Sequence, residues 1–153
     1  MSQCLLVGAG NINGNNQDDA AFLASGWIFV DSTDGSGGAH NGWLTITGNG
    51  TQAGGFSING SSYLTYDRIA IGLKSGNGQL DPDWAIFELA DNTFSGTWTI
   101  SSQSLSHAIL YGRGTPGGGG PGTGIPEPGT LALLGLGALA ATSIRRRKQQ
   151  QKT

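Results

Sequence analysis

The chain has 153 residues, 28 of them glycine, and only 12% of its residues are charged. Its length allows one domain and a tail, and its low charge sets it apart from charge-rich disordered chains. The region before Gly129 contains all ten acidic residues and three cations, so its net charge is −7. Such an acidic region would be repelled by phosphates, which argues against a nucleic-acid partner.

The first ten residues, Met1–Gly10, have no basic residue and only a short apolar patch, Leu5–Val7. The hydrophobic region of a signal peptide needs about 7–15 apolar residues. Residues 1–10 are therefore either an N-terminal strand, with Cys4–Val7 at its centre and a true start upstream, or the remnant of a signal peptide. A third possibility is a fragment that is not exported. Cys4 is the one cysteine, which excludes an intrachain disulfide.

The next segment, Asn11–Ser25, is rich in turn-forming asparagine and glycine. Asp18 is a candidate N-cap for a short helical turn that runs through Ala24. A calcium-binding loop is the alternative, but the segment lacks the order of acids and the closing glutamate of an EF-hand. The pattern favours turns.

From Gly26 onward, apolar residues alternate with a period of two, which is typical of half-buried strands. Polar turns separate the runs, and no helical crossover is visible, so the sequence predicts an all-β, antiparallel β-sandwich. We expect about seven or eight short strands in an ectodomain that spans residues 11–113. After the N-terminal run, they are residues 26–31, 43–47, 54–59, 63–74, 83–90, 96–101 and 106–111.

In two of these strands, the alternation predicts which side chains share a face. In residues 83–90, the alternation places Trp84, Ile86 and Glu88 opposite Ala85, Phe87 and Leu89. In residues 106–111 it places His107, Ile109 and Tyr111 opposite Ala108 and Leu110. This alternation makes His107 a strand-face histidine rather than a catalyst. His40 lies in a glycine-rich turn.

Candidate catalytic and metal-ligating residues are few. Asp81 and Asp83 could join Asn77 as oxygen ligands of Ca²⁺, but the ligand set is incomplete and a solvated turn before Trp84 is favoured. The acids Asp81, Asp83 and Glu88 are the nearest approach to a hydrolase site. No nucleophile-elbow or zinc-protease motif is present. We predict no enzyme activity, no cofactor and no metal. Asn49-Gly50 and Asn59-Gly60 fit hairpin turns better than glycosylation.

A Gly/Pro-rich segment, residues 114–124, follows the predicted sandwich. Seven of its residues are glycine and two are proline, so it cannot bury a core and is predicted to be a flexible linker. Its reach is roughly 18 Å. A polar tail, residues 149–153, ends the chain.

Between linker and tail, residues 125–148 read IPEPGTLALLGLGALAATSIRRRK and fall into three parts. The prolines of the first part hold Glu127 in an extended segment. The second part, residues 129–144, is uncharged and would be roughly 24 Å long as a helix, which snorkelling and local thinning can fit to a bilayer. The third part is a basic cluster that marks the cytoplasmic side. The residues of these parts are the motif Pro126, Glu127 and Pro128, the helix residues Thr130, Leu131, Leu133, Leu134, Leu136, Leu139 and Ile144, and the cluster Arg145, Arg146, Arg147 and Lys148.

These three parts, in this order and at this spacing, resemble the PEP-CTERM sorting signal of Gram-negative bacteria. The resemblance implies that an exosortase, a membrane-embedded cysteine transpeptidase, recognises the chain as a substrate and cuts it near Pro126–Pro128. It also implies export, which favours the N-terminal strand with an upstream start. An ordinary tail anchor and a soluble core helix are the alternatives, but glycines at 129, 135 and 137 disfavour a soluble helix.

The resemblance implies a precursor in the inner membrane with a periplasmic ectodomain, later delivered to the cell surface or extracellular matrix. The expected role is structural or adhesive in an exopolysaccharide or biofilm matrix. The alternative is a carbohydrate-binding module on a plain tail anchor. A flat row of exposed tryptophans would favour the module, and buried tryptophans would favour the structural role.

Overall fold

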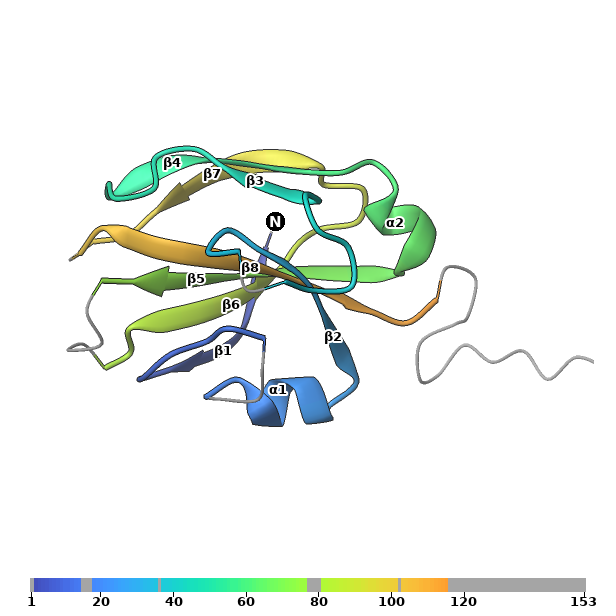
Figure 1. Ribbon diagram of the computed structural model, residues 1–153, viewed down its shortest axis with the longest axis horizontal. Helices are drawn as coiled ribbons and strands as arrows, with labels where there is room; N and C mark the ends of the chain where they lie inside the picture. Colours follow the sequence, from blue (N-terminus) through green and yellow to red (C-terminus); the bar gives the residue numbers. More distant parts are fainter. Residues whose placement is uncertain (1, 15–17, 36, 77–80, 102, 116–153) are drawn as a thin grey trace, which may run out of the picture. The chain divides into compact units, whose positions relative to one another are not determined.

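A computed structural model describes residues 2–14, 18–35, 37–76, 81–101 and 103–115 (Figure 1). All of them belong to a compact unit, Met1–Gly118, and a second unit, Gly119–Thr153, lies outside them. The linker from residue 116, the Pro-Glu-Pro motif, the apolar run, the basic cluster and the polar tail also lie outside the described residues. Within the described part of the chain, no helix is both long and apolar enough to cross a membrane.

The described residues form eight strands in two antiparallel sheets, which lie one above the other (Figure 1). The five-stranded sheet has the order β1-β6-β5-β8-β2 and the three-stranded sheet the order β3-β4-β7. The prediction of an antiparallel, all-β fold is confirmed. The strands are β1 (Gln3–Gly8), β2 (Trp27–Ser32), β3 (Leu44–Ile46), β4 (Ala53–Ile58), β5 (Arg68–Ser75), β6 (Trp84–Glu88), β7 (Ser95–Thr99) and β8 (Leu105–Arg113).

One hydrophobic core lies between the two sheets. The larger sheet contributes Ile69 and Ile71 from β5 and Leu110 from β8, and the smaller sheet contributes Leu44 and Ile58. All five side chains are buried. Each such side chain adds about 1.5–3 kcal/mol of hydrophobic stabilisation, so this core holds the two sheets together.

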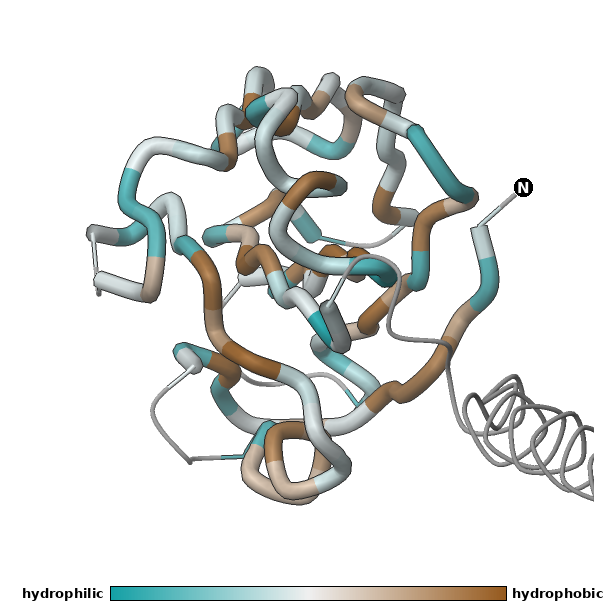
Figure 2. The backbone as a smooth tube through the Cα atoms, turned by 90° about the vertical axis from the view of Figure 1, so that its right-hand side faces the viewer, coloured by the Kyte–Doolittle hydropathy of each residue, from teal (hydrophilic) through white to brown (hydrophobic). Residues whose placement is uncertain are grey.

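A second core lies on the opposite face of the large sheet. There the short helix α1 (Ala20–Ala24) and the chain before it cover Trp84, Ile86 and Tyr111, with Phe22 and Ile12 packed against them. In Figure 2 the helical turn at the bottom, which is α1, is coloured largely as hydrophobic. The central strands β5 and β8 are therefore buried on both faces.

The predicted alternation within strands is confirmed. Trp84 and Ile86 belong to the core under α1, whereas Leu89 packs into the core between the sheets. In β8, Ile109 and Tyr111 face α1, whereas Ala108 and Leu110 face the small sheet. The prediction of a strand at Cys4–Val7 is also confirmed, because β1 pairs with β6 at the edge of the large sheet.

Three local predictions were wrong. The predicted strand 63–74 begins only at Arg68, because the helix α2 (Ser62–Thr65) precedes it. Asn59 lies in the turn before this helix rather than in a hairpin: its Oδ1 accepts the backbone N–H of Ser61, the N-cap residue, and its carbonyl accepts the Ser62 hydroxyl. Asp18 does not cap α1: Asp19 occupies the N-cap position, and Asp18 accepts the backbone N–H of Asn11 instead. The Asn49-Gly50 pair does lie in the β3–β4 hairpin, as predicted.

Candidate functional site

The three acids considered for a hydrolytic site do not come together. Asp83 is buried and lies 3.1 Å from the Nζ of Lys74, whereas Glu88 forms two hydrogen bonds to the guanidinium of Arg68. Asp81 is exposed. The bond to Glu88 raises the pKa of Arg68 above its ordinary value. Two of the three carboxylates are thus engaged by a cation each, on separate parts of the sheet.

The ion pair between Lys74 and Asp83 links the end of β5 to the segment before β6. Lys74 Nζ also donates to the carbonyls of Ser75, at 2.6 Å, and Gly76, at 3.3 Å, so all three of its protons have acceptors. The prediction of a solvated turn was wrong for Asp83, because this residue is buried. The cation of Lys74 compensates the charge of the buried carboxylate. Asn77, the third proposed calcium ligand, lies outside the described residues. No group of three acidic, histidine or cysteine side chains suited to a metal occurs within the described part of the chain.

A second buried polar group lies under α1. The hydroxyl of Tyr111 donates to Asp19 Oδ2 at 2.8 Å, and the backbone N–H of Gly14 donates to the same oxygen at 3.0 Å. Burial, and then the charge of Asp19, raises the pKa of Tyr111 well above 10. The tyrosine therefore stays neutral and anchors the loop before α1. Sequence reasoning missed this pair, because 92 residues separate its members.

Both histidines make contacts that stabilise the fold. The Nε2 of His107 lies 2.6 Å from the carbonyl of Ile12, and because a carbonyl can only accept, this nitrogen carries the proton. The prediction of a strand-face histidine is confirmed. His40 stacks on Trp43, with ring centroids 3.8 Å apart and planes inclined by 6°.

Three of the four tryptophans are buried, each about 5% exposed: Trp27, Trp84 and Trp98. Trp84 donates its indole N–H to the carbonyl of Ala9, and Trp98 donates to that of Gly55. The fourth, Trp43, is half-buried beneath His40. These positions do not form the flat row of exposed rings that would favour a carbohydrate-binding module.

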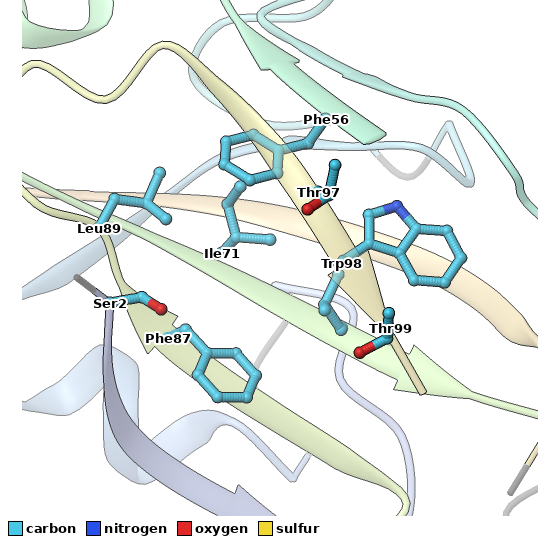
Figure 3. A pocket seen from close by; sticks show the side chains of 9 residues that line it. Ser2, Phe56, Ile71, Phe87, Leu89, Thr97, Trp98 and Thr99 are labelled. Atoms are coloured by element: carbon cyan, nitrogen blue, oxygen red, sulfur yellow. The ribbon is translucent and has the colours of Figure 1, made fainter. Parts of the chain in front are cut away.

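A cavity of about 250 Å³ opens between the sheets, beside β7 (Figure 3). Phe87 and Ile71 form its floor on the large sheet, and Trp98 stands over them from β7 (Figure 3). Ser2, Thr97 and Thr99 also line it. The volume is below the roughly 300–1,000 Å³ of ordinary small-molecule sites, and the walls carry no charge. Among the residues that line this cavity, none is an acid, a base or a cysteine.

The functional signal lies at the C-terminus. Residues 124–148 match a family model described as the PEP-CTERM protein-sorting motif. The chain carries a PEP-CTERM sorting motif. The match includes Pro126–Pro128 and the whole basic cluster, so the resemblance inferred from these residues is confirmed. No curated protein and no solved structure matched the chain.

A PEP-CTERM motif implies an exported protein that an exosortase processes. It also implies a membrane-anchored precursor that is routed to the cell surface. The PEP-CTERM motif is thus the part of this chain that indicates a function. The β-rich unit is the part that such a motif would route to the cell surface.

Proposed function

We propose that this chain is the precursor of a cell-surface or extracellular-matrix protein, cut by an exosortase at Pro126–Pro128. The observation that carries the proposal is the PEP-CTERM match at residues 124–148. The uncharged run 129–144 holds the precursor in the inner membrane, and Arg145–Arg147 keeps its C-terminal end in the cytoplasm. The ectodomain then lies in the periplasm until cleavage.

The proposed role of the ectodomain is structural or adhesive, in contact with exopolysaccharide, and not catalytic. Its ion-paired carboxylates and buried tryptophans support this role over a hydrolase or a sugar-binding module. The described residues carry nine acids and three cations, a net charge of −6. Such a surface is suited to a hydrated matrix of neutral polysaccharide or one bridged by divalent cations.

Cell fractionation tests the proposal in a host that has an exosortase. The wild-type ectodomain is expected in the surface or matrix fraction, without the peptide that contains Arg145–Arg147. A Glu127→Ala chain is expected to remain in the inner membrane with that peptide attached. Equal distribution of the two chains between the fractions would contradict a sorting role for the Pro-Glu-Pro triplet.

A further inference from the structure

A second cavity, of about 310 Å³, lies on the α1 face of the large sheet. Figure 1 shows α1 below the large sheet, with β1 and β2 directly above it. The ends of β2, β5 and β8 supply Trp27, Arg68 and Arg113 to the walls of this cavity. Its volume falls within the roughly 300–1,000 Å³ of small-molecule sites. It is thus large enough for a small ligand, unlike the cavity beside β7.

The accessible positive charge of the described residues is gathered at this cavity. These residues include three cations, of which Lys74 is buried in its ion pair. The other two, Arg68 and Arg113, lie directly opposite each other in the β5–β8 ladder. Like charges in such positions destabilise a sheet. In a unit whose described residues carry a net charge of −6, two paired arginines at a cavity indicate a site for an anion.

Among the described residues, a carboxylate engages one of these two arginines but not the other. Glu88 accepts two hydrogen bonds from the guanidinium of Arg68, which also lies over the Trp27 ring, 5.5 Å from its centroid. Arg113 is half-buried and forms no ion pair or side-chain hydrogen bond with any described residue. The carboxylate of Asp67 lies against the backbone of Gly114 and does not line the cavity. Arg113 is therefore the guanidinium that lacks a counterion.

The walls of the cavity determine what kind of anion fits beside Arg113. Leu5, Leu6 and Phe22 line it, and the Leu6 side chain is 37% exposed. The hydroxyl of Ser25, also in the lining, already donates to the carbonyl of Phe22 at 2.7 Å. The many hydroxyls of a sugar acid would find few partners on such walls, whereas an apolar body is stabilised by covering the leucines.

We propose that this cavity binds a small organic carboxylate with an apolar body, of about the size of benzoate. The guanidinium of Arg113 donates two charge-assisted hydrogen bonds to the carboxylate, and the apolar body removes Leu6 from water. Arg68 keeps its bonds to Glu88 and lines the opposite side of the site. The site belongs to the β-rich unit, so it goes beyond the sorting role and does not depend on cleavage at Pro126–Pro128.

Calorimetric titration of the full, uncut chain with benzoate tests the proposal, in excess nonionic detergent and against a blank that contains detergent alone. The wild type is expected to bind one benzoate. Arg113→Gln is expected to weaken binding at least about tenfold, because the hydrogen bonds to a charged group are lost. Arg113→Lys keeps the charge but not the two-pronged geometry, so its affinity is expected to lie between these two.

The matched control is Gln52→Glu, which changes the net charge by the same amount as Arg113→Gln. Gln52 is exposed and lies outside the cavity, so the substitution is expected to leave the affinity unchanged. Glu88→Gln gives a prediction of opposite sign: it frees Arg68 from its counterion, and the affinity for benzoate is expected to rise severalfold.

Three other probes test the chemistry of the ligand. Benzamide lacks the charge, inorganic phosphate lacks the apolar body, and galacturonate carries its carboxylate on a polar ring, so each is expected to bind more weakly than benzoate. A wild type that does not bind benzoate, equal affinities of Arg113→Gln and Gln52→Glu, or weaker binding by Glu88→Gln would overturn the proposal. So would tighter binding of phosphate, benzamide or galacturonate. Because the chain is uncut, none of these results bears on sorting by an exosortase.

Discussion

Removal of the cation from the buried Lys74–Asp83 pair should destabilise the β-rich unit severely. In Lys74→Met the side chain keeps nearly the same length but loses its charge and its three hydrogen bonds. Asp83 Oδ1 is already buried with no partner among the described residues, and the substitution would leave Oδ2 in the same position. The carboxylate would then be buried with nothing to compensate its charge.

The size of the effect follows from that burial. The Lys74 side chain is 5% exposed and that of Asp83 1%. Breaking a buried pair by removing one partner costs about 3–5 kcal/mol. For a folded unit of this size each kcal/mol lowers the melting temperature by roughly 4 °C, so we expect a fall of about 12–20 °C.

Arg68→Met is the matched control, because it removes the cation of the other ion pair in the same sheet. The Arg68 side chain is 39% exposed, and exposed pairs contribute about 0–1 kcal/mol. Tryptophan fluorescence can follow urea unfolding of the full chain, since all four tryptophans precede residue 99. In Lys74→Met/Asp83→Leu no charge remains buried, and much of the stability is expected to return. If Lys74→Met costs no more than Arg68→Met, the pair is not buried as described.

Two further predictions concern packing and pH. Gly112→Ala should cost about 1–3 kcal/mol, because its Cβ would lie 2.4 Å from the ring of Tyr66, whereas Gly60→Ala, which meets nothing within 4 Å, should stay within about 0.5 kcal/mol. Equal melting temperatures for the two variants would contradict the close packing. Burial and the charge of Asp19 raise the pKa of Tyr111, so the folded state keeps the hydroxyl proton above pH 10, whereas the unfolded state loses it. The free energy of unfolding of the wild type should therefore fall as the pH rises beyond about 10. In Tyr111→Phe it should fall less steeply. Parallel pH profiles for both chains would refute that assignment.

Most strands could be predicted from the sequence, because alternation is a local signal that each segment carries by itself. The run from Trp84 to Leu89 shows this, since its two faces meet two different cores. The helix α2 escaped prediction because Tyr63 and Thr65 have side chains typical of strands. The turn before it is held by hydrogen bonds that Ser61 and Ser62 donate to Asn59, and the alternation of apolar residues does not report these bonds.

The buried polar residues could not be predicted for a different reason. Asp19 and Lys74 look like ordinary surface residues until their partners are known, and Tyr111 and Asp83 reach them only through the fold. The sorting motif could be predicted because its parts are contiguous. Its three physical signals, extended prolines, an uncharged run and clustered cations, require no tertiary structure.

The most direct test of the central claim is the intact mass of the mature protein from exporting, exosortase-containing cells. The account predicts a wild-type chain that ends near Pro126–Pro128, and a Glu127→Ala chain that retains its C-terminus. A wild-type mass that still includes Arg145–Arg147 would contradict cleavage at the PEP-CTERM motif.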